Sequence, residues 1–161
     1  MREKPGPGYR HVLRKNDVID FISILPDWAS LSKGLNAIIL APGDIHCDGW
    51  HDAGVVAVTA WEKVLWRTVS PEYYADHRDI FDRLEVERVK TANEYQCRFT
   101  LAQVRAYQLL HILLHELGHH HDRMTTRSKR EASRGEGFAE QYALRHERLI
   151  WQRYTETLKL A

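Results

Sequence analysis

The stretch 101–122, LAQVRAYQLLHILLHELGHHHD, decides how this chain folds. Apolar residues recur through it at the spacing of one helix face, and neither proline nor glycine interrupts it before Gly118. Thr100 followed by Gln103 matches the capping box, in which each side chain accepts a hydrogen bond from the other residue's backbone N–H. The pattern therefore predicts a long helix over about 101–122.

The same stretch contains an H-E-x-x-H motif, His115-Glu116-Leu117-Gly118-His119. Two histidines four residues apart lie one turn apart on one helix face, so both rings can reach a single Zn²⁺ at about 2.0–2.1 Å. Glu116 projects beside that position and is the predicted catalytic base, which would hold and deprotonate a zinc-bound water. Gly118 costs the helix about 1 kcal/mol relative to alanine. We expect a close approach of another backbone, or of the site, to explain it.

Chance matches to this motif are not negligible, because 10 of the 161 residues are histidine. Composition alone gives a chance match of roughly 5 %. A helix with two unrelated histidines is therefore the alternative interpretation, and the apolar context of the motif weighs against it.

A catalytic zinc site needs a third protein ligand and one open position. Glu136 and Glu140 follow His119 by 17 and 21 residues. They begin a segment whose apolar residues recur at helical spacing, which predicts a second helix over about 136–154. Acidic residues in a first helical turn also suit the helix dipole, so the two glutamates could equally serve the helix alone.

Together these residues resemble the gluzincin branch of the zincin metallopeptidases, in which H-E-x-x-H is followed on a downstream helix by E-x-x-x-D or E-x-x-A-[DN]. The resemblance implies that Glu136 is the third zinc ligand and that Ala139 is the small residue of the pattern. It also implies that Glu140 accepts a hydrogen bond from a ligand histidine and orients its ring. The chain has Glu140 where the family usually has Asp or Asn, so Glu140 is also an alternative ligand.

The resemblance implies a zinc-dependent metallopeptidase with one Zn²⁺ per chain and a peptide or protein substrate. The transition state would need a further donor besides zinc. Candidates are Tyr142, His146, Tyr95 and Tyr107. Three other interpretations stay open: a non-proteolytic zincin-like binding or regulatory domain, a zinc hydrolase of a non-peptide amide, and a structural metal module. In the last, Asp122, Glu140 or His111 would complete the coordination.

Other polar residues surround the motif. The metzincin branch would need glycine and histidine where this chain has Asp122 and Thr125. We interpret Asp122 as a residue of the helix end or as a residue hydrogen-bonded to a ligand, with a direct ligand role as the alternative. His111 lies one turn before His115 and is interpreted as a packed or partly solvated residue. His120 and His121 point away from the ligand face, so we expect them to be exposed.

The rest of the chain predicts strands ahead of the two helices. We expect a short helix from Asn16 or Asp17 to Leu25, strands at 37–41 and 54–61, and a hairpin of 84–89 with 95–99. This order indicates one α+β domain over 1–161, in which a small, mostly antiparallel or mixed sheet packs on two long helices. Residues 1–15, with several prolines and glycines, are expected to form a loose arm. The order also resembles the minimal zincin plan, in which an edge strand binds the substrate, here 54–61 or 84–89.

Two further segments carry many polar groups. The segment 44–52, DIHCDGWHD, is interpreted as a polar loop between strands, with a second metal site or a wall of the cleft as alternatives. A basic connector between the two helices is interpreted as a solvated loop, with a flap or a preference for acidic substrates as alternatives. Its members are Arg123, Arg127, Lys129, Arg130 and Arg134.

Bulk properties restrict the function further. The net charge of +1 does not favour nucleic acid as a partner. The chain has no apolar run of about 18 residues, so the sequence does not predict a membrane-spanning helix. Because the first residues also lack an apolar signal core, we expect a cytoplasmic protein. Two cysteines are too few for a disulfide framework.

Overall fold

The computed structural model describes residues 1–126 and 133–159, so Arg127, Lys129 and Arg130 of the basic connector lie outside the described residues. The chain forms a mixed α+β structure, as expected. Its strands and helices follow one another in this order: β1 (Tyr9–Arg10), α1 (Lys15–Ile24), α2 (Trp28–Leu31), β2 (Ala37–Ala41), β3 (Gly49–Asp52), β4 (Val55–Thr59), β5 (Trp61–Glu62), β6 (Trp66–Val69), α3 (Pro71–Arg83), β7 (Glu87–Lys90), β8 (Tyr95–Arg98), α4 (Leu101–Tyr107), η1 (Gln108–Leu113), α5 (Leu114–Thr125) and α6 (Gly135–Thr157).

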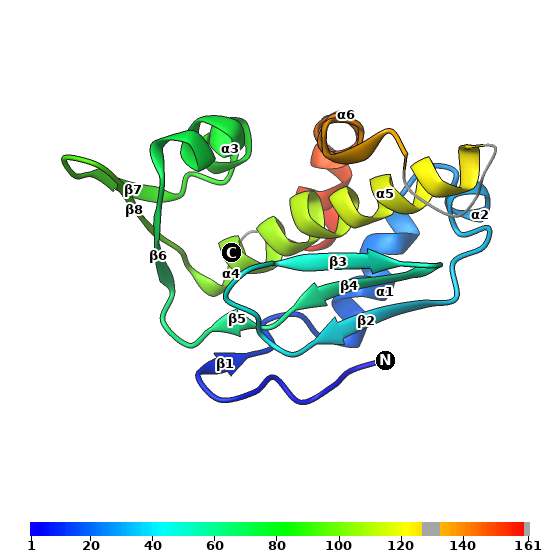
Figure 1. Ribbon diagram of the computed structural model, residues 1–161, viewed down its shortest axis with the longest axis horizontal. Coiled ribbons are helices and arrows are strands. Elements are labelled where there is room, and N and C mark those ends of the chain that lie inside the picture. The colour runs from blue at the N-terminus through cyan, green and yellow to red at the C-terminus, as the bar shows by residue number, and fades with distance from the viewer. Residues whose placement is uncertain (127–132, 160–161) are drawn as a thin grey trace.

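In the part of the chain that the structure describes, three small sheets replace the single sheet expected from the sequence. In the order β2-β4-β3, β2 runs parallel to β4 and β3 runs antiparallel to it. The sheet β6-β8-β7 is antiparallel, and β1 pairs with β5 alone. The expected strand at 54–61 divides at Ala60, because β4 pairs with β2 and β3 whereas β5 pairs with β1. In Figure 1 the first sheet lies along α5, while the antiparallel sheet and α3 stand to one side of it.

The predicted motif helix is confirmed as the continuous run α4–η1–α5, which begins at Leu101 and ends at Thr125. Its capping box is present, since Thr100 Oγ1 accepts from the Gln103 N–H at 3.1 Å and Gln103 Oε1 accepts from the Thr100 N–H at 2.8 Å. The segment η1 is π-helical, a conformation that inserts an extra residue into the turn and occurs frequently at functional sites. The turn directly before His115 is therefore wider than a regular α-helical turn.

The second long helix, α6, packs against α5, as Figure 1 shows. It extends over Gly135–Thr157 and includes the expected range 136–154. The two backbones approach closely at Gly118, where a Cβ atom would lie 3.0 Å from Ala139 Cα and 3.1 Å from Ala139 O. This contact confirms the expected reason for a glycine inside the motif.

Two sequence predictions about the chain's periphery were wrong. Residues 1–15 are not a loose arm, because backbone hydrogen bonds join Met1 and Glu3 to Leu40 and β1 pairs with β5. The hairpin strand expected at 84–89 begins only at Glu87, since Glu85 has a left-handed φ of 55° that an extended strand does not allow. The hairpin itself, β7 with β8, is confirmed.

Several elements were not expected from the sequence. These are α2, α3 and the strands β1, β3 and β6. The helix α3 does carry a start signal, because Ser70 Oγ accepts a hydrogen bond from the Tyr73 N–H and Pro71 occupies the first helical turn. Within residues 1–126 and 133–159, no helix is long and apolar enough to cross a membrane.

Gly118→Ala is expected to destabilise the metal-free protein by about 1 kcal/mol. The gain in helix propensity, about 1 kcal/mol, is outweighed by overpacking against the Ala139 backbone, which typically costs about 1–3 kcal/mol. Gly137→Ala is the matched control, because a Cβ there meets nothing within 4 Å. Urea denaturation should show Gly118→Ala less stable and Gly137→Ala at least as stable as the wild type. Equal stabilisation by both substitutions would contradict the close contact.

Candidate metal centre

Three side chains from α5 and α6 converge on one point. Glu136 lies 3.0 Å from His115 Nε2 and 3.2 Å from His119 Nε2, and the two Nε2 atoms are 3.2 Å apart. Two ligands about 2.1 Å from a tetrahedral ion are separated by roughly 3.3–3.4 Å. The spacing of these atoms therefore fits a metal ion between them with little rearrangement. Two imidazoles and a carboxylate are also a donor set that zinc accepts.

Glu140 contacts the other nitrogen of the same histidine. Its Oε2 lies 3.1 Å from His115 Nδ1, whereas Glu136 faces Nε2. A carboxylate at Nδ1 accepts the ring N–H and leaves the Nε2 lone pair free for a metal, which is the usual support of a ligand histidine. The two glutamates thus face different nitrogens of the His115 ring, which the sequence could not show.

Asp122 binds the start of α6. It is fully buried and accepts hydrogen bonds from the backbone N–H groups of Arg134 at 2.8 Å and Gly135 at 3.1 Å. The Arg134 guanidinium also donates to it at 2.8 Å. Since Gly135 directly precedes Glu136, this carboxylate fixes where Glu136 stands. Both its oxygens are engaged in these bonds, and it does not line the cleft.

Glu116 is buried at the side of the converging ligands, with 7 % of its surface exposed. It packs beside Gly49 of β3, where a Cβ atom would lie 3.0 Å from Glu116 Cγ. Burial raises the pKa of Glu116 to about 7, although His115 opposes the shift. A carboxyl with a pKa near neutral can both accept and return a proton, which general acid–base catalysis requires.

The charges around the two motif histidines differ. Burial opposes protonation of His115, but the hydrogen bond to Glu140 and the nearby carboxylates raise its pKa overall. Burial and the neighbouring His115 lower the pKa of His119. In the protein without a metal, His115 therefore binds a proton more readily than His119 does. A metal ion would compete with that proton.

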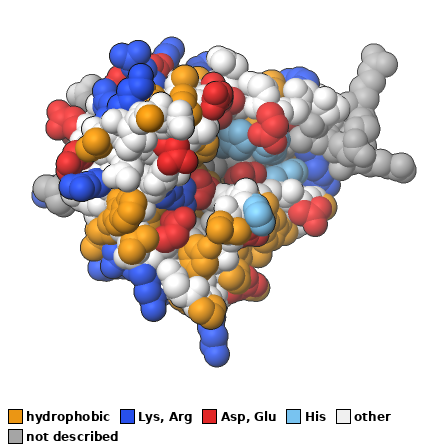
Figure 2. All heavy atoms as spheres, turned by 60° about the vertical axis from the view of Figure 1, so that its left-hand side comes forward, with side chains coloured by type: hydrophobic (Ala, Val, Ile, Leu, Met, Phe, Trp, Pro, Cys, Tyr) orange, Lys and Arg blue, Asp and Glu red, His pale blue; other side chains and the backbone are white. Residues whose placement is uncertain are grey.

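The converging residues lie in an open cleft of about 1430 Å³. Figure 2 shows histidine side chains gathered in a hollow, with acidic side chains around them. Along one side runs β3, whose residues all line the cleft and which, among the described strands, pairs with β4 alone. Two edge strands line the cleft, β3 and β6, whereas 54–61 contains the middle strand β4 and 84–89 does not line the cleft.

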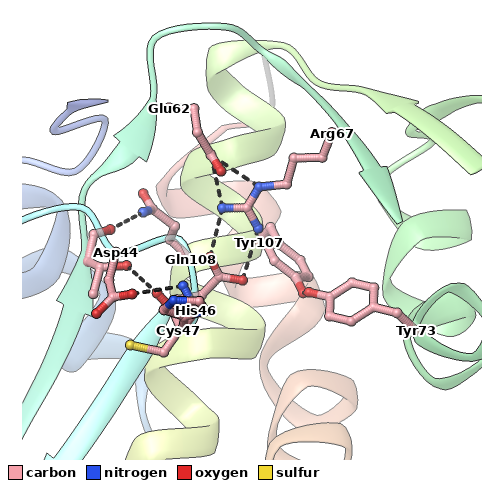
Figure 3. A network of polar contacts seen from close by, with 10 residues as sticks. Asp44, His46, Cys47, Glu62, Arg67, Tyr73, Tyr107 and Gln108 are labelled. Carbon is pink, nitrogen blue, oxygen red and sulfur yellow. Dashed lines mark hydrogen bonds and ion pairs between the residues drawn. The ribbon is translucent and has the colours of Figure 1, made fainter. Parts of the chain in front are cut away.

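The segment 44–52 forms a wall of the cleft. Its second half is β3, and the first half is fixed by a polar network in which Arg67 binds Asp48 at 2.7 Å and Glu62 at 3.0 Å. Figure 3 shows Arg67 beside Glu62 and the Tyr73 and Tyr107 hydroxyls meeting below it, 2.6 Å apart. In the part of the chain that the structure describes, no three ligand atoms of this segment converge as a metal site would require.

The structure does not bring all candidate donors to the cleft. Tyr142 and His146 stack on each other at 4.0 Å and do not line it, nor does Tyr95, which stacks on Tyr74. Of the four candidates only Tyr107 lines the cleft. His51 and His77, which the sequence did not single out, also line it. The Ser70-Pro71 start signal could have predicted the helix that carries His77. His51 belongs to the polar segment 44–52, which we interpreted as a loop.

The two histidines after the motif are not exposed, contrary to expectation. His120 is 1 % exposed and lies 2.9 Å from the carbonyl oxygen of Lys33, to which its Nε2–H can donate. His121 is half-buried against Phe138 and Tyr142 of α6. Helical spacing correctly separated them from the ligand face, but it could not show which elements cover the other faces.

No protein-family model matches the chain, and neither a search of curated proteins nor a search of solved structures finds a match. The geometry of the cleft therefore carries the functional assignment.

Glu116→Gln is expected to stabilise the metal-free protein at pH 8 and to have little effect near pH 4.5. Because the pKa of Glu116 is raised from 4.5 to about 7, the stability that this carboxyl contributes is present below about 4.5 and lost as the pH rises through 7. Glutamine does not ionise and avoids this loss, which amounts to at most about 3 kcal/mol. Urea denaturation after chelator treatment measures it, with Glu156→Gln, an exposed residue of α6, as control. The same difference at both pH values would rule out this burial effect.

Proposed function

We propose that this protein is a zinc-dependent metallopeptidase of the gluzincin type, with His115, His119 and Glu136 as the metal ligands. The observation that carries the proposal is the convergence of these three side chains at 3.0–3.2 Å, beside the buried Glu116, in an open cleft. Zinc bound there would lower the pKa of a coordinated water toward about 7 and polarise the scissile carbonyl.

The chain's own residues perform the proton transfers. Glu116 takes the proton of the attacking water and delivers it to the leaving amine, a role for which its buried position at the cleft suits it. Glu140 holds the His115 ring through Nδ1, and Asp122 holds the first turn of α6. Both keep the ligands in place without contacting the substrate.

The shape of the cleft favours a peptide over a small amide. Its volume of about 1430 Å³ exceeds the roughly 300–1,000 Å³ typical of small-molecule pockets. The free edge of β3 offers backbone groups to which an extended peptide can add as a further strand. Exposed apolar side chains also line the cleft and suit a substrate with bulky apolar residues: Ile45, Trp50, Val64 and Trp66.

The alternatives are supported less well. A structural metal module would need a fourth protein ligand, yet Asp122 binds the start of α6 and Glu140 faces the other nitrogen of His115. A non-proteolytic binding domain would keep the metal without turnover.

Both cysteines, Cys47 and Cys97, are unpaired. We therefore include a reducing compartment such as the cytoplasm in the proposal.

The proposal is tested by separating metal binding from turnover. Glu136→Ala is expected to lose one zinc equivalent that the wild type retains after dialysis, as measured by mass spectrometry, while the exposed control Glu156→Ala loses none. Glu116→Gln is expected to keep that zinc and to cleave an apolar-rich peptide library at least about 100-fold more slowly. A Glu136→Ala variant that retains as many zinc equivalents as the wild type would refute the ligand set, and full activity of Glu116→Gln would refute the catalytic base. A zinc-loaded but inactive wild type would favour a binding domain.

Asp122→Asn is expected to weaken zinc binding about 10–100-fold, because the start of α6 would lose its charged anchor. A zinc titration against a competing chelator measures the affinity, and circular dichroism checks that the helices remain. Asp79→Asn is the matched control, since Asp79 pairs with Arg148 on the surface. Unchanged affinity in Asp122→Asn would show that Glu136 does not depend on this anchor.

A further inference from the structure

A second group of ligand atoms meets in the same cleft. His77 of α3, His111 of η1 and Glu140 of α6 each place one ligand atom within 4.8 Å of the others. All three residues line the cleft, and none is a ligand in the centre described above. We propose that they form a second metal site, which takes a divalent transition-metal ion such as zinc. Imidazole and carboxylate are donors that such ions accept.

The hydrogen bond of His77 prepares its ring for a metal. Its Nδ1 lies 2.7 Å from the carbonyl oxygen of Tyr73, an acceptor only, so Nδ1 carries the hydrogen. The lone pair is therefore on Nε2, on the opposite side of the ring. Ligand histidines in proteins commonly donate their other N–H to a backbone carbonyl in this way, which fixes the tautomer and the ring orientation.

His111 is buried without the hydrogen bonds that burial normally requires. It is 4 % exposed, and in the described part of the chain its Nδ1 has no hydrogen-bond partner. Its Nε2 lies 3.7 Å from Glu140 Oε2, too long for a hydrogen bond. Two ligands each about 2.1 Å from one ion are 3.7 Å apart when the ligand–metal–ligand angle is about 124°, which is wider than the tetrahedral angle. The gap thus fits two ligands of one metal better than a direct contact.

Glu140 has acceptor capacity left for a metal. One oxygen faces His115 Nδ1 at 3.1 Å, while Oε1 is buried and, among the described residues, makes no hydrogen bond. An ion would engage these unused lone pairs. Because the same carboxylate orients His115, occupancy of the second site would be coupled to the first centre through Glu140.

The surrounding backbone is consistent with a site at this place. His111 lies within η1, and such π-helical turns occur frequently at functional sites. The ring of His77, on α3, contacts the ring of His111, and their centroids are 4.6 Å apart. A metal held by His77 would therefore tie α3, which forms one wall of the cleft through Tyr73 and His77, to the two ligand-bearing helices.

The test counts zinc ions bound to the full chain, using zinc alone as the probe in calorimetric titrations of chelator-treated protein. The wild type is expected to bind two equivalents, His77→Ala one, Glu136→Ala one, and the double variant none. His46→Ala, an exposed histidine of the cleft, is the control and should bind two. His77→Gln, and cobalt absorption spectra in the Glu136→Ala background, replace His77→Ala if that variant does not fold.

A single equivalent in the wild type, or two retained by the folded His77 variant, would overturn the second site. The outcome is independent of the proposed peptidase. Zinc lost by the His77 variants but not by Glu136→Ala would leave the second site standing and refute the first ligand set. Zinc lost by Glu136→Ala but not by the His77 variants would refute the second site and leave the first ligand set standing.

Discussion

The packing of α6 on α5 at Gly118 is the constraint on which the rest of the site depends. A Cβ at this position would be closer to the Ala139 backbone than most real Cβ contacts, so glycine allows this approach without a shift of either helix. The contact sets both the distance and the register of the two helices. Glu136 lies three residues before Ala139 on α6 and Glu140 lies one residue after it, so the reach of both carboxylates toward α5 follows from this contact. If α5 and α6 lay further apart, the carboxylates of Glu136 and Glu140 would no longer reach the His115 ring.

Two buried charges near the cleft are tolerated because neighbouring groups of opposite charge or polarity match them. Asp122 is fully buried but accepts from two backbone N–H groups and a guanidinium. Arg67 is held by Asp48 and Glu62 and lies over the Trp61 ring at 3.4 Å. Glu116 differs from both, since burial raises its pKa to about 7. In the metal-free protein this carboxyl therefore exchanges a proton near neutral pH.

The sequence predicted the parts of the site that local periodicity determines. His115 and His119 share a face because they are four residues apart, and the glycine between them indicated a close neighbour, which Ala139 supplies. Contacts between distant segments were not accessible in the same way. The strand β3 exists through pairing with β4, and the burial of His120 depends on a loop 87 residues away. The π-helical turn has no periodic signal that would distinguish it from an α-helix.

The arrangement of the centre follows from two pairs of side chains, one pair on each helix. The two pairs have the same spacing along their helices and face each other. His115 and His119 are one turn apart on α5, and Glu136 and Glu140 are one turn apart on α6. Across the helix contact, Glu136 reaches both Nε2 atoms while Glu140 reaches Nδ1 of one ring. A slip of α6 by one residue would turn both carboxylates by about 100° around its axis and separate them from the histidines. The anchor at Asp122 and the contact at Gly118 act against that slip from two positions along the helix, so the ligand geometry is a property of the helix register rather than of any single side chain.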